Sequence, residues 1–253
     1  MRVLLTNDDG VEAEGLRILR RIAGQISDDV WICAPASEQS AASRGVSLHH
    51  PVRLKKIDDK VFSVSGTPTD SVIVAMKDVF ANHPPDLVLS GVNRGQNMAE
   101  DITFSGTVAG ALQGMQMGVP SIALSLAKGF QGENSLPWET AETHGPRIIQ
   151  TLLEAGWPKN VIMNINFPDC APDAVKGVQM TQQGHRDFQM SGIDKRPHPR
   201  GGYYYWLTYG AKLSNPPKGV DLRAIYDGYI SITPLHVDLT HYESLDRLST
   251  LFD

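Results

Sequence analysis

The stretch that decides the fold is VLLTNDDG at residues 3–10, in which a short apolar run leads directly into an acidic turn. Apolar residues then recur at helical spacing from Leu16 to Ile26, and a second apolar run covers residues 30–33. This order predicts a strand, a helix and a second strand. Such a unit is typical of a parallel sheet that is covered by helices.

The alternation of helices and strands continues to about residue 170. The expected helices cover residues 70–80, 107–117 and 138–155, and the expected strands cover residues 87–89, 121–126 and 161–167. Because a helix separates each strand from the next, the strands run parallel and the helices cover both faces of the sheet. The pattern therefore predicts an α/β fold of three layers, with a parallel sheet between two layers of helices.

The pattern changes after residue 170. Stretches that look like strands occur at residues 179–183, 203–209 and 229–233, and segments rich in Gly and Pro, such as 196–202 and 215–219, separate them. These pieces are too polar and too broken to form a second core. We expect a single domain over residues 1–253, with a core at 1–170. Residues 171–253 are expected to form extended hairpins or arms that pack on a neighbouring subunit, with a short helix over 242–252.

Residues 203–206 are the aromatic cluster YYYW. Such a cluster suits an interface or the wall of a ligand site, and we favour the interface. This cluster and residues 184–199 are also candidates to close over a site, from the same subunit or from another one.

Composition excludes several classes of protein. The 253 residues include 23 Lys and Arg against 28 Asp and Glu, with a net charge of -5 and no long run of either sign, which argues against binding of duplex nucleic acid. No apolar stretch approaches the roughly 18 residues of a membrane span, and the chain turns acidic too early for a signal peptide. The two cysteines form no CxxC pair. We expect a cytoplasmic protein without a membrane partner.

Polar loops follow three of the expected strands. They cover residues 7–10, 34–40 and 91–97. Ligands of an open parallel sheet bind at the carboxyl ends of its strands. We therefore expect these three loops to meet at one edge of the sheet and to form the functional site.

The first of these loops contains two adjacent carboxylates, Asp8 and Asp9, which repel each other unless a cation lies beside them. Ser40 and Asn93 in the other two loops offer neutral oxygens. A set of oxygen ligands suits Mg²⁺, Mn²⁺ or Ca²⁺. The sequence NDDG is also good turn chemistry, and either aspartate is able to cap the following helix. The convergence of the three loops favours the metal site.

Ser105, Gly106 and Thr107 stand where the expected helix over 107–117 begins. Backbone N–H groups and hydroxyls at the amino end of a helix favour an anion, and a phosphoryl group fits there. An ordinary Ser or Thr cap is the alternative. A cation that faces such an anion site would serve metal-assisted phosphoryl transfer or hydrolysis.

The chain contains motifs of one family in the right order. They are NDDG at 7–10, GTPTDSV at 66–72, SGVNRGQN at 90–97, FSGTVAGAL at 104–112 and GYISITPLHVDLT at 228–240. With these motifs the chain resembles the SurE family of survival-protein 5'-nucleotidases, which are metal-dependent phosphatases. The resemblance runs nearly from end to end, and it implies a Rossmann-like fold.

The resemblance also implies which residues form the site. One divalent cation per subunit, Mg²⁺ or Mn²⁺ with Ca²⁺ as a crystallographic substitute, would be held by Asp8, Asp9, Ser40 and Asn93. The phosphate would be bordered by Asn97, Ser105, Gly106 and Thr107. The implied substrates are nucleoside 5'-monophosphates, with some activity on 3'-nucleotides and short polyphosphate. The implied assembly is a homodimer or homotetramer that forms through the C-terminal extensions.

Two positions depart from the pattern of the family. Phe104 stands where many relatives have Tyr, and Ala41 stands where many have Gly. Phe keeps the aromatic face and loses the hydroxyl. We expect Ala41 to restrict its loop to ordinary backbone angles and to shift Ser40 slightly.

The hypothesis for catalysis assigns Asp8, Asp9, Asn97 and Ser105 as the catalytic residues. The two aspartates hold the cation that activates a water molecule, and either of them is able to accept its proton. Asn97 orients the phosphate, and Ser105 with Thr107 stabilises charge on its oxygens.

Other functions remain as alternatives. One is a broader phosphatase or exopolyphosphatase, and another is a regulatory module that binds nucleotides without turnover. A nicotinamide oxidoreductase is remote because the chain has no GxGxxG motif. The P-loop, nucleophile-elbow and HExxH motifs are also missing.

Overall fold

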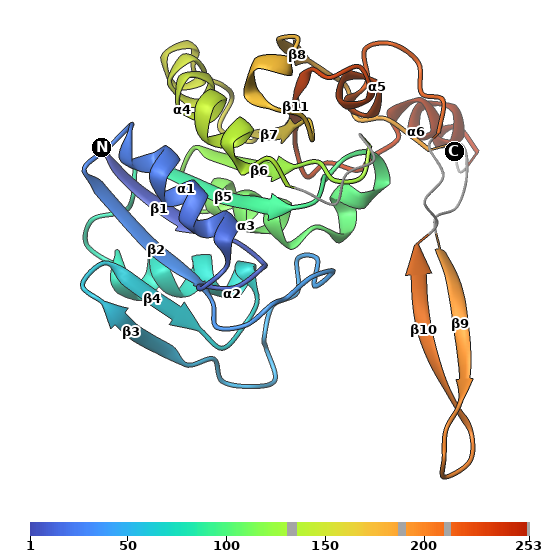
Figure 1. The fold of residues 1–253 in the computed structure, drawn as a ribbon, viewed down its shortest axis with the longest axis horizontal. Helices are drawn as coiled ribbons and strands as arrows, with labels where there is room; N and C mark the ends of the chain where they lie inside the picture. The colour runs from blue at the N-terminus through green and yellow to red at the C-terminus, as the bar shows by residue number, and fades with distance from the viewer. Residues whose placement is uncertain (131–135, 187–190, 210–213, 252–253) are drawn as a thin grey trace.

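The computed structural model describes residues 1–130, 136–186, 191–209 and 214–251. A nine-stranded sheet with the strand order β3-β4-β2-β1-β5-β6-β7-β11-β8 runs through the body (Figure 1). Its strands are β1 (Arg2–Thr6), β2 (Asp29–Pro35), β3 (Leu54–Asp58), β4 (Val61–Val64), β5 (Leu87–Arg94), β6 (Ser121–Leu126), β7 (Ile162–Phe167), β8 (Val178–Met180) and β11 (Ile230–Leu235). The pairings β3 with β4 and β7 with β11 are antiparallel, and the other pairings in this sheet are parallel.

The apolar run that opens the chain forms a central strand buried on both faces. Val3 and Leu5 belong to one hydrophobic cluster and Leu4 to another, and none of the three is exposed to solvent. Side chains of a strand alternate between its faces, so a strand between two helix layers is apolar throughout. This is why residues 3–5 contain no polar side chain.

Helices cover both faces of the sheet. The helices α1 (Glu14–Gly24) and α4 (Trp138–Ala155) pack on one face, and α2 (Pro68–Val74) and α3 (Gly106–Gln116) pack on the other. A capping box between Thr67 and Asp70 starts α2, which continues as a π-helical turn over Ala75–Val79. The predicted α/β fold of three layers is confirmed.

The strand order places the predicted site. In the sheet, β1 and β5 are neighbours. The next strand after β1, which is β2, lies on the far side of β1, and the next strand after β5, which is β6, lies on the far side of β5. Ligands of open α/β sheets bind where the connections of neighbouring strands diverge in this way. The ends of β1 and β5 are therefore the place where residues 7–10 and 93–97 meet.

Two strands at one edge of the sheet were not predicted. The strands β3 and β4 form an antiparallel hairpin, and most of β3 is exposed. Its sequence LKKID has little apolar character. An edge strand of this kind needs one apolar face at most, and its lysines hinder pairing with another chain.

The C-terminal region corrects one expectation. Part of residues 171–253 belongs to the body, because β8 and β11 extend the main sheet and α5 (Asp221–Tyr226) packs beside β11. Ile230 and Ile232 are buried in the main core, which explains why β11 is more than an arm. The expectation of an extended hairpin holds for β9 (Ser191–Pro197) and β10 (Tyr203–Tyr209), which form a separate two-stranded sheet that projects from the body (Figure 1).

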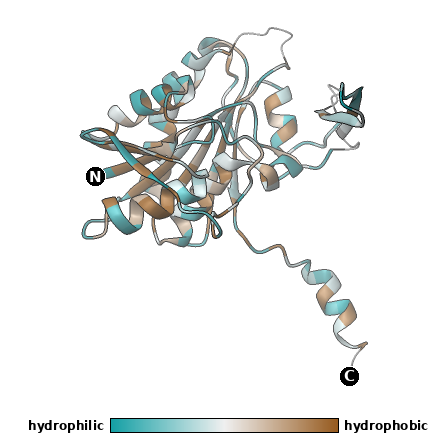
Figure 2. Cartoon of the chain, turned by 90° about the horizontal axis from the view of Figure 1, so that it is seen from below, coloured by the Kyte–Doolittle hydropathy of each residue, from teal (hydrophilic) through white to brown (hydrophobic). Residues whose placement is uncertain are grey.

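The helix α6 (Tyr242–Ser249) confirms the helix predicted over 242–252, and it ends before residue 250; residue 252 lies outside the described residues. Figure 2 shows α6 at the end of an extended segment, away from the body. Within the part of the chain that the structure describes, no helix combines the length and the apolar character that crossing a membrane requires.

Candidate active site

A pocket of about 460 Å³ lies at the carboxyl ends of the central strands. Six of the predicted residues line it, namely Asp8, Asp9, Ser40, Asn93, Asn97 and Ser105. Its other lining residues are Glu38, Ala41, Arg94, Gly95, Gln96, Asp101, Phe104 and Lys128. The volume falls in the range of sites for small molecules, roughly 300 to 1,000 Å³.

Asp8 lies just past the end of β1 and is 5% exposed. The hydroxyl of Thr107 donates a hydrogen bond of 2.5 Å to its Oδ1 atom. A Cβ atom on Gly106 would lie 2.7 Å from the Cβ atom of Asp8, so only glycine allows α3 to approach this closely. Burial raises the pKa of Asp8 to about 6, the bond from Thr107 opposes this rise, and the charge of Asp9 adds to it.

Asp9 is half-buried beside it. Its Oδ2 atom accepts a hydrogen bond of 3.3 Å from the backbone N–H of Arg94 at the end of β5. Burial raises the pKa of Asp9, the N–H of Arg94 lowers it, and the charge of Glu38 raises it further. Two carboxylates that are both costly to ionise favour a cation between them, since the cation stabilises the ionised form of each.

Ser40 and Asn93 carry neutral oxygens into the same pocket. The Ser40 hydroxyl donates to Oε1 of Glu38 over 2.8 Å, and Nδ2 of Asn93 donates to the carbonyl of Gly95 over 2.9 Å. These bonds use the hydroxyl hydrogen of Ser40 and one N–H of Asn93, and they leave oxygen lone pairs of both side chains for another partner.

The donor set fits a hard divalent cation. Oδ1 of Asp8 accepts a hydrogen bond from Thr107, and Oδ2 of Asp9 accepts one from Arg94. The other carboxylate oxygen of each aspartate is the candidate metal ligand. Together with Ser40 and Asn93 they form the set of oxygen atoms that Mg²⁺ and Mn²⁺ prefer. Within the described residues, no three His, Cys, Asp or Glu side chains gather into a metal site. A metal centre here therefore depends on the neutral oxygens as much as on the two carboxylates.

Asn97 is clamped at the wall of the pocket. Its Nδ2 atom donates to Oγ of Ser125 over 2.8 Å, and its backbone N–H donates to Oδ1 of Asn166 over 2.9 Å. Its carbonyl accepts from Nδ2 of Asn164 over 2.8 Å and from Nδ2 of Asn166 over 3.1 Å. Polar side chains of β6 and β7 thus hold the position of Asn97.

Ser105 caps α3, because its hydroxyl accepts a hydrogen bond of 3.0 Å from the N–H of Val108. It also lines the pocket, so the cap and the pocket wall are the same residue. Thr107 is fully buried and turns its hydroxyl toward Asp8 rather than into the pocket. At the amino end of α3, Thr107 therefore orients the carboxylate of Asp8, and Ser105 faces the pocket.

Ala41 differs from the sequence expectation. It adopts φ of 60° in the left-handed region, so the expected restriction to ordinary backbone angles was wrong. The contacts of the surrounding loop outweigh the cost of this conformation, roughly 1–2 kcal/mol for a residue with a side chain. Phe104, the other departure, is 56% exposed at the pocket.

Sequence reasoning missed two residues that line the pocket, Lys128 and Asp101. Lys128 follows the end of β6, where the rule for strand ends would have found it. Its backbone N–H donates to Oε1 of Gln96 over 3.1 Å. Asp101 lies in a 3₁₀ segment over Ala99–Phe104, and no pattern in the sequence pointed to it.

The chain is similar to known proteins over its full length. The family model of survival protein SurE matches residues 3–190. The 5'-nucleotidase SurE of Hyphomonas neptunium is 57% identical over 248 residues, which cover 98% of each chain. The 5'-nucleotidase SurE of Caulobacter vibrioides strain NA1000 is 57% identical over 249 residues, or 98% of this chain and 95% of that protein.

A solved structure agrees with these sequence matches. The crystal structure of the SurE protein from Aquifex aeolicus superposes with a TM-score of 0.85 at 34% sequence identity, and the match covers 100% of both chains. The family model spans most of this chain, and two relatives share more than half of its residues. The chain therefore belongs to the SurE family.

Proposed function

We propose that this protein is a metal-dependent phosphatase that hydrolyses nucleoside 5'-monophosphates to nucleoside and inorganic phosphate. The observation that carries this proposal is the meeting of Asp8 and Asp9 with the amino end of α3 in one pocket. The carboxylates favour a cation, and the helix end favours an anion. The relatives named 5'-nucleotidase SurE support the same activity.

The cation is one Mg²⁺ or Mn²⁺ per subunit, held by Asp8, Asp9, Ser40 and Asn93. When bound, it supplies Lewis-acid polarisation of the phosphate and lowers the pKa of a water molecule. Thr107 keeps Asp8 in place for this task by its hydrogen bond. The backbone N–H of Arg94 does the same for Asp9.

The phosphate lies between the cation site and α3. Ser105 and Gly106 border it at the amino end of the helix, where the helix dipole stabilises negative charge on the phosphate oxygens. Asn97, which also lines the pocket, orients the phosphate, because Ser125 and Asn166 fix its position. Lys128 adds a positive charge at the same pocket.

The range of substrates includes 3'-nucleotides and short polyphosphate. The cation site and the amino end of α3 suit the phosphoryl group, which 5'-nucleotides, 3'-nucleotides and polyphosphate share. Because this part of the pocket binds only the phosphoryl group, it accepts more than one leaving group.

The active protein is a homodimer or homotetramer. Large apolar side chains of β10, including Tyr204, Trp206 and Leu207, are more than half exposed on the projecting hairpin. Leu245 and Leu251 are equally exposed at the C-terminal helix. Aromatic and apolar surfaces of this kind mark interfaces, and a second copy of this chain buries them.

The protein acts in the cytoplasm. Cys33 and Cys170 are both free thiols, and free thiols persist in a reducing compartment. Burial raises the pKa of Cys33 to about 12, so this thiol is inert.

Phosphate release from a panel of nucleoside monophosphates tests the proposed function. The protein with Mn²⁺ or Mg²⁺ should release phosphate from 5'-monophosphates, and a chelator should abolish the release. Asp9→Asn should lose activity and remain folded, whereas Asp28→Asn, an exposed aspartate far from the pocket, should behave like the wild type. Binding of nucleotide without release of phosphate from any monophosphate would contradict the proposal.

A further inference from the structure

The 3₁₀ segment Ala99–Phe104 forms one wall of the pocket. Two of its side chains, Asp101 and Phe104, line the pocket, and Ser105 follows directly. This segment has no strand or long helix of its own to hold it. Its position therefore depends on contacts with other parts of the chain.

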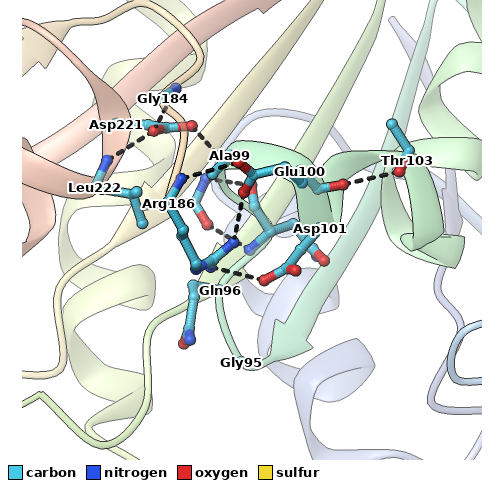
Figure 3. Close-up of polar contacts among 12 residues, drawn as sticks. Gly95, Gln96, Ala99, Glu100, Asp101, Thr103, Gly184, Arg186, Asp221 and Leu222 are labelled. Carbon is cyan, nitrogen blue, oxygen red and sulfur yellow. Dashed lines mark hydrogen bonds and ion pairs between the residues drawn. The ribbon is translucent and has the colours of Figure 1, made fainter. Parts of the chain in front are cut away.

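The start of this wall is tied to the C-terminal region. The backbone N–H of Ala99 donates to Oδ2 of Asp221 over 2.9 Å, and the carbonyl of Ala99 accepts from Nε2 of Gln183 over 3.0 Å. Asp221 is fully buried, and its Oδ1 atom accepts from the N–H of Gly184 over 2.9 Å. Figure 3 shows Asp221 between Gly184 and Ala99. Both backbone polar groups of Ala99 are therefore bound by residues more than 80 positions away in the sequence.

Arg186 holds the next two residues of the wall. Its Nη1 atom donates to Oε2 of Glu100 over 3.2 Å, and its Nη2 atom donates to Oδ2 of Asp101 over 2.7 Å. Its backbone N–H donates to Oε1 of Glu100 over 2.9 Å. In Figure 3 the guanidinium group lies between the two carboxylates. One side chain thus bridges two consecutive acids of the wall.

This arginine is buried at the junction. Its side chain is only 7% exposed, against 30% for the side chain of Asp101. A buried guanidinium is stable where carboxylates take its N–H groups, and its planar fork favours two such partners at once. Burial raises the pKa of Asp101, and the charge of Arg186 acts against this rise. Arg186 therefore also offsets part of the negative charge of Glu100 and Asp101 beside a site for a phosphate.

The wall adjoins the part of the pocket that suits the phosphate, because Ser105 follows Phe104 directly. The phosphate end is defined by Asp8, Asp9 and Ser105, and the pocket of about 460 Å³ is much larger than one phosphate group. Phe104 exposes an aromatic face at the pocket, and Asp101 exposes a carboxylate there. An aromatic ring stacks on a nucleobase, and a carboxylate accepts hydrogen bonds from ribose hydroxyls.

We propose that Arg186 is a positioning residue that holds the wall Ala99–Phe104 in place against the nucleoside part of the substrate. This inference rests on the proposed nucleotidase function, and it assigns the recognition of the nucleoside to a wall that the C-terminal region clamps. Arg186 acts through Glu100 and Asp101 and does not touch the phosphate.

Steady-state kinetics of Arg186→Gln on two substrates test this inference. The substrates are adenosine 5'-monophosphate and glycerol 3-phosphate, a phosphate monoester without base or ribose, both with saturating Mn²⁺. Loss of hydrogen bonds to charged groups should raise KM for the nucleotide about tenfold or more. The kcat for the nucleotide and the kcat/KM for glycerol 3-phosphate should change by less than about threefold, since the phosphate end keeps its contacts.

Conservative and control variants accompany this measurement. Arg186→Lys should recover part of the KM, because an ammonium keeps the charge and loses the planar fork. Arg223→Gln is the matched control: Arg223 lies on α5, it pairs with Asp227, and it does not line the pocket. This control should keep the wild-type KM. The Mn²⁺ concentration for half-maximal activity should stay unchanged in all three variants, because the proposed metal ligands contact none of the replaced side chains.

A double-mutant cycle with Asp101→Asn shows whether Arg186 acts through the wall. If it does, Arg186→Gln should raise KM much less in the Asp101→Asn background than in the wild type. A folded Arg186→Gln protein with wild-type KM, or an equal loss on both substrates, overturns the inference. If Arg186→Gln does not fold, the KM values of Arg186→Lys and Asp101→Asn for the nucleotide test the inference. A wild-type KM in both variants overturns the inference. Absence of phosphate release by the wild type from every nucleotide overturns the proposed function as well.

Discussion

Thr107 donates its hydroxyl to Oδ1 of Asp8 over 2.5 Å, which joins the first turn of α3 to the end of β1. Both side chains are almost completely buried, Thr107 at 0% and Asp8 at 5% exposure. A buried carboxylate keeps its orientation only if the groups that donate hydrogen bonds to it stay in place. The bond therefore links the stability of the helix start to the geometry of the proposed metal site.

Thr107→Val should reduce both stability and activity. Valine has the same shape and lacks the hydroxyl, so Oδ1 of Asp8 loses its partner at a cost of roughly 1–3 kcal/mol in the free energy of unfolding. We expect a kcat/KM for nucleotide that is lower by about tenfold or more, since Asp8 loses the side-chain hydrogen bond that helps to orient it. Denaturant unfolding and phosphate release measure the two effects. Thr143 is exposed, and Thr143→Val is the control. Equal stability and equal kcat/KM in the two variants would contradict the role of Thr107 in orienting Asp8.

Gly106→Ala should displace Asp8. The added Cβ atom would lie 2.7 Å from the Cβ atom and 3.0 Å from Oδ2 of Asp8, which is too close for either group to remain in place. A shift of about 1 Å at a reacting centre lowers activity by about 100-fold, and we expect a loss of this order. Gly24→Ala meets no atom within 4 Å and should keep full activity. Titration with Mn²⁺ should show weaker activation for Gly106→Ala, and unchanged activation would argue against a metal ligand at Asp8.

The ion pairs of Asp29 should make the stability of the folded protein depend on pH. Hydrogen bonds from Lys60, Arg2 and Trp31 hold the pKa of Asp29 well below its ordinary value of 3.8. A carboxyl group with a lowered pKa in the folded state stabilises that state above the unfolded pKa, and this contribution is lost as the pH falls below it. Asp29→Asn should therefore be less stable than the wild type at pH 7, with a difference that shrinks below about pH 4.

Denaturant unfolding at several pH values measures this difference. The neighbouring Asp28 is exposed, and Asp28→Asn should follow the wild type at every pH. A difference between Asp29→Asn and the wild type that stays constant down to acid pH would show that Asp29 contributes by packing rather than by its charge.

Ala41→Gly should stabilise the loop that carries Ser40. Ala41 has φ of 60°, where a Cβ atom costs roughly 1–2 kcal/mol and glycine is unstrained. Part of this gain is offset by the greater freedom of glycine in the unfolded chain, so we expect about 1 kcal/mol or less. Ala36→Gly, at ordinary backbone angles in the same loop, should destabilise instead. Thermal unfolding shows whether each variant is more or less stable than the wild type. A loss of stability in Ala41→Gly would show that the backbone of Ala41 is not strained.

Local patterns in the sequence were sufficient for most of the fold. The apolar run at 3–5, the helical spacing of α1 and the residues of β6 and α4 depend on burial against neighbours that any parallel sheet supplies. The strand β3 was missed because an edge strand needs little apolar character. The strand β4 is mostly apolar but only four residues long, so its sequence pattern is too short to stand out. The strand β11 was found, and its place beside β7 was not, because pairing partners are chosen by contacts distant in sequence.

The sequence by itself determined which residues are available for chemistry. An acidic pair after the first strand, polar loops after two others and Ser-Gly-Thr before a helix are local features, and the rule for strand ends brings them to one edge. The same rule would have found Lys128.

Only the tertiary structure decided how these residues act on one another. It turns Thr107 toward Asp8 and away from the pocket, and it brings Arg186 to Glu100 and Asp101 from more than 80 residues away. The physical reason is that burial, hydrogen-bond partners and charge neutralisation depend on the packing of whole elements, which no local pattern contains.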